Sequence, residues 1–392
     1  MSKALSRFIA IYCGLLMSIG AFSIDISLPA IPGMVTDLAA PTAWVQWTVT
    51  IYMFTGAFGQ LLAGPASDRF GRKPVLLAGI ALYFAGAVLS ALAPGVEWLL
   101  AGRALQGFGA AAPIVMSRAI IRDLYAGAEL ARNLAFATMF FALGPVIAPF
   151  AGSFLDGQFG WRAIYASLAV WAVALAVMLA FIPETLKSPQ RDALSPRVFR
   201  ANTVRLIRHP QSRRFLAVSV TAMAAMLLII TSAAPLYEEN FGLTGLAFAS
   251  YFALHGLGIV IGQWANRRLI PRVGVVRAAL TGAGVLTFAA SLILMVALGG
   301  TMTPGLLTGL LIFYATSYLI VYSNAAALVL DPHGEIAGFS TALMGFMSQM
   351  GAAIIVSVLV VFIGGSLVAW AAVLTAICLV CLVQIGTWKG QR

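Results

Sequence analysis

Long apolar segments alternate with short polar segments along the whole chain. Residues 75–93 and 367–383, for example, contain no charged residue. A helix of about 20 apolar residues spans a bilayer, whereas the strands of a transmembrane β-barrel alternate apolar and polar residues over about ten positions. The pattern therefore predicts twelve transmembrane helices, at residues 8–32, 43–63, 75–93, 98–120, 133–154, 162–182, 215–236, 246–265, 277–298, 303–328, 336–363 and 367–387.

The composition agrees with this all-α membrane fold. Of the 392 residues, 61% are apolar and 9% are charged, and the mean hydropathy is +0.96. An ordinary soluble domain has about a quarter of its residues charged. The composition therefore excludes a water-soluble globular chain and indicates a polytopic membrane protein.

The positions of the basic residues predict the orientation. A net charge of +11 in a soluble protein would suggest nucleic-acid binding. Here an N-terminus placed inside puts 22 of the 24 Lys and Arg residues on the cytoplasmic side, with Arg162 outside and Arg103 within the membrane. Basic loops are retained in the cytoplasm, so both termini are predicted to lie there and no nucleic-acid partner is expected. Short loops and a first helix that acts as an uncleaved insertion signal favour the bacterial inner membrane.

The chain divides into two similar halves. A polar connector at 183–214 separates six predicted helices in 1–182 from six in 215–392. Parallel repeats of this kind are typical of transporters, with a binding site between the halves near mid-membrane. The repeat is carried by five identities at an offset of 203 residues: Gly59, Gln60, Arg69, Gly71 and Gly79 recur as Gly262, Gln263, Arg272, Gly274 and Gly282.

The turn between the second and third predicted helices holds the most specific motif, Gly64-Pro65-Ala66-Ser67-Asp68-Arg69-Phe70-Gly71-Arg72-Lys73-Pro74. It closely resembles the signature loop of the major facilitator superfamily. The resemblance implies a charge relay that latches the outward-open state, and the alternative is a solvated loop that only sets topology. In the second half Pro271 stands opposite Asp68, so that copy has no carboxylate for a latch. The expected gating residues are Gly64, Asp68, Arg69, Gly71, Arg72 and Lys73, with Asp123 as a third charged member of the relay.

A narrower resemblance covers nearly the whole chain and is carried by an ordered set of short matches. They are Ile24-Asp25-Ile26-Ser27-Leu28-Pro29-Ala30, Arg103-Ala104-Leu105-Gln106-Gly107, Arg118-Ala119-Ile120-Ile121-Arg122-Asp123-Leu124-Tyr125, Gly144-Pro145-Val146-Ile147-Ala148-Pro149, Gly160-Trp161-Arg162-Ala163-Ile164-Tyr165 and Pro183-Glu184-Thr185-Leu186. The set resembles the drug:proton antiporters of the bicyclomycin and chloramphenicol resistance (Bcr/CflA) group. It implies the major facilitator fold of two six-helix bundles, and amphenicol- or bicyclomycin-like substrates.

Asp25 is the expected proton-coupling residue. On a straight helix it lies about 27 Å beyond Arg7, in the outer part of the bilayer. Acids within the membrane are costly and are functional by default, because loss of water favours the neutral form. Pro29 cannot donate to the carbonyl of Asp25, so a kink is expected at this site. The alternative is a carboxyl that only satisfies a kinked helix end.

Arg103 is expected at a similar depth, because it follows Glu97 at the outer surface by six residues, or about 9 Å. The superfamily fold places the first and fourth helices side by side on the central cavity. We therefore hypothesise that Arg103 tunes the proton affinity of Asp25, with Gln106 also on the cavity. A structural role for Arg103, such as donation to backbone carbonyls, is an equal alternative.

Further residues are assigned by position and by resemblance. Tyr314, Tyr318 and Tyr322 repeat every four residues and would form one aromatic cavity wall, although helix packing is the commoner use of such a face. His255 is the only histidine in the middle of a predicted helix and could sense pH or pack. The fifth helix partly matches the antiporter motif of exporters, a bent and closely packed segment, through Gly144, Pro145, Pro149 and Gly152.

Other functional classes have less support. An exporter or importer of an endogenous metabolite would share the fold, the loop and the topology, and it remains the alternative function. An enzyme is not expected, because the sequence has no HExxH, no GxSxG and no paired carboxylates within the membrane. No metal and no cofactor are expected. The expected partners are a small drug, protons and anionic lipid headgroups, and the protein is expected to be a monomer.

Overall fold

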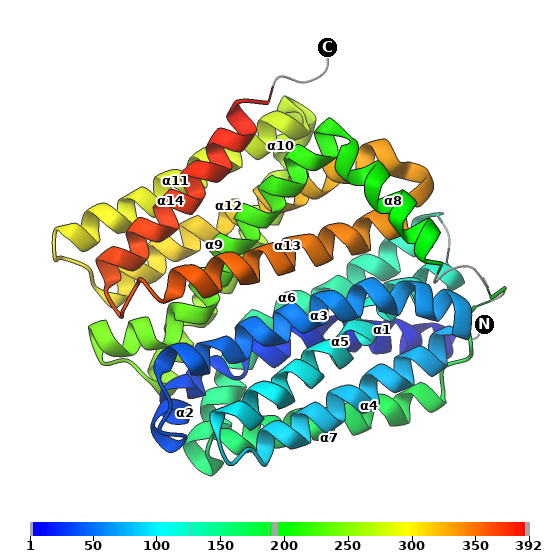
Figure 1. The fold of residues 1–392 in the computed structure, drawn as a ribbon, viewed down its shortest axis with the longest axis horizontal. Coiled ribbons are helices and arrows are strands. Elements are labelled where there is room, and N and C mark those ends of the chain that lie inside the picture. Colours follow the sequence, from blue (N-terminus) through cyan, green and yellow to red (C-terminus); the bar gives the residue numbers. More distant parts are fainter. Residues whose placement is uncertain (1–2, 126, 187, 190–194, 389–392) are drawn as a thin grey trace. The chain divides into compact units, whose positions relative to one another are not determined.

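The computed structural model describes the chain except residues 1–2, 126, 187, 190–194 and 389–392, and some side chains in 3–5, 127–146 and 334–338 also lie outside the described set. Within the described part all regular secondary structure is helical (Figure 1). The elements are α1 (Lys3–Asp25), η1 (Leu28–Ala30), α2 (Ile31–Asp37), α3 (Thr42–Phe70), α4 (Arg72–Ala91), α5 (Val96–Leu124), α6 (Gly127–Phe159), α7 (Trp161–Ala180), α8 (Pro196–Arg208), α9 (Pro210–Phe241), α10 (Gly245–Val273), α11 (Val275–Leu298), α12 (Pro304–Leu330), η2 (Asp331–Ile336), α13 (Ala337–Val360) and α14 (Leu367–Gly386).

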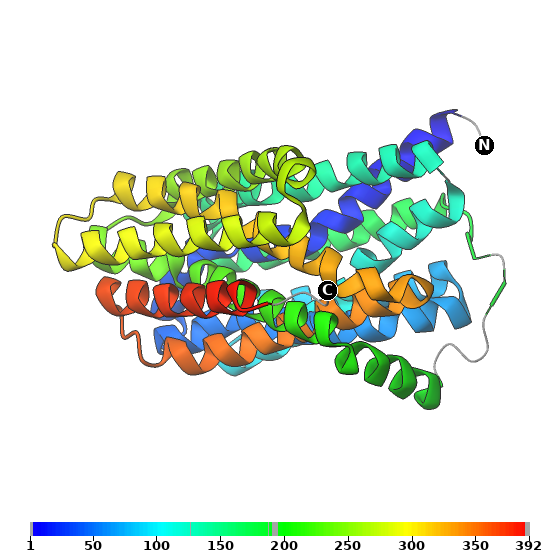
Figure 2. The same cartoon turned by 90° about the horizontal axis from the view of Figure 1, so that it is seen from above.

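The helices form two compact units. Unit 1 comprises Met1–Phe199 and unit 2 comprises Arg200–Arg392, so the boundary falls inside α8. This short helix lies in the polar connector, and the hydropathy pattern did not predict it because its apolar positions are few and lie on one face. Figure 2 shows α8 leading into the long helix α9 across a bend. The bend is at His209, which is the N-cap of α9.

Ten helical segments in the described part of the chain are long and apolar enough to cross a membrane. The sequence predicted twelve, and the two predicted spans that fall outside the ten are α3 and α6. In α3, buried polar side chains such as Gln46, Thr48 and Thr50 lower the hydropathy of a helix of 29 residues. These polar groups face the interior of unit 1, where hydropathy is a poor guide to membrane position.

The first predicted span is not a single continuous helix in the structure. The sequence predicted one helix over 8–32, but α1 ends at Asp25 and the chain continues through η1 into α2, which ends at Asp37. Pro29 lies in η1 and has no amide hydrogen to continue the helical ladder. The kink predicted from Pro29 is therefore a complete interruption that places Asp25 at a helix end.

The repeated glycines have matching packing roles in the two units. A Cβ at Gly59 would meet the Phe108 carbonyl at 2.6 Å, and a Cβ at Gly262 would overlap the Thr316 carbonyl. Small residues let transmembrane helices approach closely, so these glycines bring α3 against α5 and α10 against α12. The repeat in the sequence thus corresponds to the same helix contact made once in each unit.

Candidate functional site

Asp25 lies at the interruption of the first transmembrane segment. It is 5% exposed, and none of the ion pairs in the described part of the chain includes it. The backbone closes the turn after it with bonds from Ile26 N to the Phe22 carbonyl (3.1 Å) and from Ser27 N to the Ile24 carbonyl (3.1 Å). An unpaired, buried carboxylate costs free energy. The site can therefore hold a proton, or exchange it for a polar group that offers better contacts.

The fifth-helix motif packs against this interruption. A Cβ at Gly152 of α6 would overlap the carbonyl of Ile26, and a Cβ at Gly144 would lie 3.4 Å from the Cβ of Ala21. Pro149 is buried, whereas the side chain of Pro145 lies outside the described residues. The described contacts of the motif are thus made with the first transmembrane segment inside unit 1, directly beside Asp25.

Arg103 is fully buried in unit 1. Its Nε donates to the carbonyl of Thr48 (3.1 Å), and its Nη1 donates to the carbonyl of Ser23 (3.3 Å) and to Oε1 of Gln106 (2.6 Å). The guanidinium also lies over the ring of Tyr52, 4.2 Å from the centroid. Arg103 therefore joins α5 to α3 and to the last turn of α1.

The Arg103 site retains unused donors. Arg103 Nη2 and Gln106 Nε2 are buried and have no hydrogen-bond partner within the described structure, and the Tyr52 hydroxyl is likewise unpaired. Arg103 and Asp25 do not form an ion pair in this structure, although Arg103 bonds the carbonyl of Ser23, two residues before Asp25. The carbonyl contacts match the structural alternative for Arg103, and its tuning of Asp25 stays a prediction.

The signature loop brings its charged residues together. Arg72 contacts Asp68 through Nη1 (2.6 Å) and Asp123 through Nε (3.0 Å), and its Nη1 also donates to the hydroxyl of Ser67 (2.6 Å). Arg72 is 4% exposed, so these bonds satisfy a nearly buried guanidinium. The three residues expected to form the relay are therefore in contact inside unit 1, at the junction of α3, α4 and α5.

Glu184 completes this cluster and had no assigned role in the sequence. Its carboxylate accepts from the amides of Arg72 and Lys73, the first two residues of α4, both at 3.0 Å. It also accepts from the amides of Thr185 and Leu186, both at 2.9 Å. Partial burial raises the pKa of Glu184, but the four amide donors together outweigh it and hold this pKa below its ordinary value. The position was visible only as part of the Pro183-Glu184-Thr185-Leu186 match.

Asp123 also accepts from the Thr185 hydroxyl, at 3.2 Å. The segment that follows α7 is thereby tied to the start of α4 through Glu184 and to the end of α5 through Thr185. Because the connector begins here, the latch residues are coupled to the start of the chain that leads to unit 2. We refer to Asp68, Arg72, Asp123, Glu184 and Thr185 as the latch cluster.

A cluster around Asp37 in unit 1 was also missed by sequence reasoning. The Asp37 carboxylate accepts from the Trp161 indole (2.9 Å) and from the Arg162 guanidinium, and Arg162 also donates to the carbonyl of Ala93 (3.1 Å). The cluster ties α2 to the start of α7 and to the turn before α5. It holds α2, which continues the first transmembrane segment beyond Asp25.

The predicted cavity residues of unit 2 lie inside that unit. Tyr314 is fully buried, and the Tyr318 hydroxyl contacts the sulfur of Met223 at 3.6 Å. Tyr318 and Tyr322 stack at 5.9 Å between ring centroids, and His255 stacks on Phe252 at 5.7 Å. The Tyr318–Met223 contact joins α12 to α9, whereas the two ring stacks each lie within one helix. Contact of these residues with a substrate stays a prediction.

A histidine pair at the start of α9 was not singled out in the sequence. His209 Nδ1 accepts from the amide of Ser212 at 3.5 Å, and the Ser212 hydroxyl contacts His333 Nε2 at 3.0 Å and the carbonyl of Val329 at 3.1 Å. The two imidazole rings are 5.5 Å apart. They join the start of α9 to the segment between α12 and α13. The sequence could not reveal this contact, because the two histidines are 124 positions apart.

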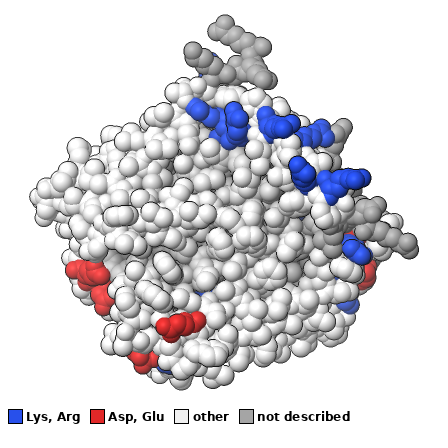
Figure 3. Space-filling view, in the orientation of Figure 1, with Lys and Arg blue, Asp and Glu red and all other residues white. Residues whose placement is uncertain are grey.

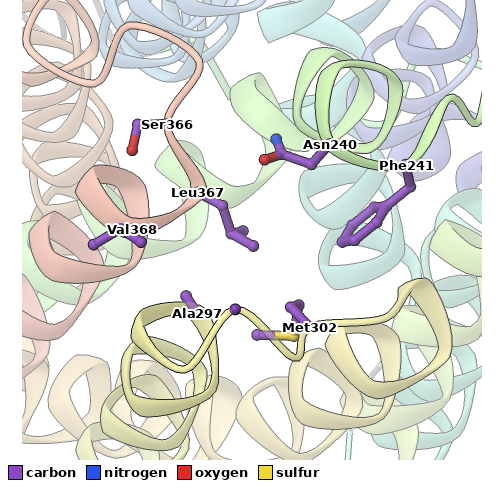
Figure 4. Close-up of a pocket in the computed structure, with 8 residues that line it drawn as sticks. Asn240, Phe241, Ala297, Met302, Ser366, Leu367 and Val368 are labelled. Atoms are coloured by element: carbon purple, nitrogen blue, oxygen red, sulfur yellow. The ribbon is translucent and has the colours of Figure 1, made fainter.

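Figure 4 shows a pocket of about 320 Å³ in unit 2. It lies where α9 ends, between the α11–α12 and α13–α14 turns, and it contains none of the predicted site residues. Its only side-chain amide belongs to Asn240, and it has no charged side chain, so it does not match the chemistry expected for proton coupling. It is lined by Asn240, Phe241, Ala297, Gly300, Met302, Ser366, Leu367 and Val368.

Two helical units with matching internal contacts and long apolar helices are typical of membrane transporters. A model of the family described as "Major Facilitator Superfamily" matches residues 13–356. The chain therefore belongs to the major facilitator superfamily, as the signature loop predicted. It is a transporter of small molecules and not an enzyme.

Individual relatives agree with the narrower resemblance. The chain is 27% identical to a bicyclomycin resistance protein homolog of Haemophilus influenzae, over 88% of this chain and 87% of the relative. It is 32% identical to a chloramphenicol resistance protein of Pseudomonas aeruginosa, over 83% and 75%. It is 26% identical to multidrug resistance protein D of Escherichia coli, over 88% and 86%. These relatives and the membrane-spanning helices support a multi-pass protein of the bacterial inner membrane.

Solved structures confirm the fold. The partially occluded inward-open xylose transporter XylE from E. coli matches with a TM-score of 0.78 and 13% identity, over the full length of both chains. The human organic anion transporter MFSD10 matches with a TM-score of 0.66 and 19% identity. At these identities the likeness shows a shared fold, while the substrate has to be argued from the chain's own residues.

Proposed function

We propose that the protein exports small amphiphilic antibiotics, of the amphenicol or bicyclomycin kind, in exchange for protons that move inward. The names of its relatives, bicyclomycin, chloramphenicol and multidrug resistance proteins, support the substrate class. The halves would alternate in opening a central cavity to the two sides of the membrane. Each cycle would carry a drug out while Asp25 carries a proton in the opposite direction.

The buried carboxyl of Asp25 is the observation that carries the proposal. It ends a helix, it is 5% exposed, and no described cation pairs with it. A carboxyl in this setting can bind a proton or a polar drug group, and binding one disfavours the other. That competition is the minimum that an exchanger needs.

The remaining assignments extend this scheme. We propose twelve helices with both termini in the cytoplasm, as six-helix bundles over 1–182 and 215–392 joined by the connector at 183–214. The latch cluster would gate the cytoplasmic side, and the basic cytoplasmic loops would contact anionic lipid headgroups. The protein would act as a monomer. Substrate would contact Asp25, Arg103, Gln106, Tyr314, Tyr318, Tyr322 and His255.

Inside-out vesicles with an acidic lumen test the proposal. A pH-sensitive dye in the lumen reports proton efflux when a drug from an antibiotic panel is added. We expect drug-dependent efflux for the wild type and for Glu97→Gln, which removes an exposed acid at the outer start of α5. We expect none for Asp25→Asn, because an amide cannot carry the proton.

The other outcomes reassign function in defined ways. Efflux that persists in Asp25→Asn would keep antiport but contradict the coupling role of Asp25, and His255→Asn would then be tested. A wild type that responds to no drug would contradict drug export and favour transport of an endogenous metabolite. The Glu97→Gln control separates a general loss of acidic charge from the loss of this carboxyl.

Arg103 is tested through the pH profile. If Arg103 tunes Asp25, Arg103→Ala shifts the pH optimum of drug-dependent efflux, and Arg103→Lys shifts it less because the charge remains. A purely structural role predicts lower protein yield and lower rates at an unchanged optimum. Gln106→Ala removes the Oε1 acceptor of Arg103 and leaves its charge in place, so it separates loss of this contact from loss of the charge.

A further inference from the structure

The turn between α10 and α11 gathers four arginines without a described acidic partner. Arg267, Arg268, Arg272 and Arg277 are all exposed, and the ion pairs recorded for the described residues all lie in unit 1. Figure 3 shows basic side chains over the end of α10 and over α8. Four exposed arginines that take part in no described ion pair fit an anionic partner from outside the chain.

The equivalent turn of unit 1 contains an internal ion pair, Arg72 with Asp68. Shifted by 203 residues, Asp68 corresponds to Pro271 and Arg72 to Val275, so the second turn lacks both members of the ion pair. A Cβ at Gly71 would meet Glu184 Oε2 at 2.9 Å, whereas a Cβ at Gly274 would meet no atom within 4 Å. The basic turn of unit 2 is therefore open where the turn of unit 1 is filled by a carboxylate.

An exposed tryptophan of α10 lies between the arginines and an exposed apolar face of the same helix. Trp264 is 57% exposed, and the guanidinium of Arg268 lies over its ring at 3.6 Å from the centroid. Leu257, Val260 and Ile261 are each about half exposed and precede Trp264 by seven, four and three residues, on the same face of α10. Tryptophan at such a transition is typical of the membrane interface.

We propose that the turn formed by Arg267, Arg268, Arg272 and Arg277 binds the phosphate of an anionic phospholipid in the cytoplasmic leaflet. The arginines would take the headgroup, Trp264 would lie at the level of the glycerol backbone, and the exposed face of Leu257, Val260 and Ile261 would take the acyl chains. The continuous change from basic to apolar along one helix face fits an amphiphile and not a free phosphate ion. The site deepens the lipid contact proposed above and rests on it.

Native mass spectrometry of the purified full-length protein with phosphatidylglycerol tests this site. We expect the wild type to retain phosphatidylglycerol in preference to phosphatidylcholine. Arg268→Gln with Arg272→Gln should bind phosphatidylglycerol about thirtyfold more weakly, on the scale of about fivefold per arginine at an anionic surface. The pair Arg268→Lys with Arg272→Lys should recover most of the affinity.

A charge-matched control decides whether the site is local. Arg197→Gln with Arg200→Gln removes two exposed arginines from α8 and should change affinity less than about threefold. An equal loss in both double variants would overturn the proposal in favour of general charge attraction. Displacement of the lipid by soluble glycerol phosphate would also overturn it, since it would indicate a soluble-anion site. No transport is measured here, so failure of drug export leaves this test unaffected.

Discussion

The two equivalent helix turns, at Gly71 in unit 1 and at Gly274 in unit 2, share a backbone and differ in chemistry. Both glycines have positive φ, 100° and 81°, and each separates two long helices. The first turn holds Arg72 between two aspartates and is capped by Glu184. The second has Pro271 and Val275 at the paired positions, and the charged residues of 267–277 are all arginines.

The comparison shows that the two copies of the repeat share the glycines that set the backbone, whereas the ion-paired residues beside them differ. Left-handed backbone and close helix packing require glycine at the same positions in both units, so those identities persist at the offset of 203 residues. Charged residues are not needed for the turn itself. One copy can therefore hold the ion pairs of Arg72 while the other presents exposed arginines.

Of the substitutions in the two turns, removal of Arg72 should change the free energy of unfolding most. Arg72→Ala leaves Asp68 and Asp123 without their counter-charge near a buried site, at a cost of about 2–3 kcal/mol in the free energy of unfolding. This is less than for a fully buried pair, because Asp68 is partly exposed. Denaturant titration in detergent micelles measures it. A change below about 0.5 kcal/mol would show that the latch cluster contributes no stability.

Alanine at the two glycines should separate the cost of the backbone conformation from the cost of crowding Glu184. Both Gly71→Ala and Gly274→Ala force a residue with a Cβ into positive φ, at about 1–2 kcal/mol. Gly71→Ala also crowds Glu184 Oε2, so we expect it to be the more destabilising by about 1 kcal/mol. Equal effects in the same titration would mean that Glu184 moves aside without losing its amide bonds.

Glu184→Gln should cost about 1 kcal/mol at neutral pH, because it removes a charged cap from the start of α4. The folded-state pKa of Glu184 lies below its unfolded value, so its contribution is present above the unfolded pKa of about 4.3 and disappears as pH falls through the lower folded value. The difference in unfolding free energy between wild type and variant should therefore shrink with acidification. A difference that grows with acidification would contradict this assignment.

Arg272→Gln should have the smallest effect, within about 0.5 kcal/mol, because Arg272 is exposed and takes part in none of the ion pairs found among the described residues. Thermal unfolding in lipid-free detergent measures it. A loss comparable with that of Arg72→Ala would reveal a structural role for the basic turn and remove the contrast between the two units.

The sequence was sufficient for features that depend on local pattern. Long apolar segments located most of the helices, and Pro29 predicted an irregularity at Asp25. The signature loop named Asp68 and Arg72, and Asp123 was added by its place on the fourth helix; Arg72 contacts both aspartates in unit 1. The functional roles of these residues stay predictions. Hydropathy was least informative for α3, where polar side chains are buried inside a bundle.

Features that depend on tertiary approach could not be predicted. Glu184 caps α4 from 112 residues away, and His333 meets Ser212 from 121 residues away. Arg103 illustrates a subtler limit, because two of its three hydrogen-bond acceptors are backbone carbonyls, which any sequence offers. Backbone acceptors leave no trace in residue identity, so only a structure distinguishes them from an ion pair.

Proton release on drug binding tests the central claim about Asp25 most directly. Purified protein in weakly buffered detergent solution, with a pH-sensitive dye, is titrated with an antibiotic that it transports. The account predicts that binding releases protons from the wild type, and that Asp25→Asn releases none while Glu97→Gln behaves as the wild type. Equal proton release by Asp25→Asn, or drug binding to the wild type without release, would contradict it.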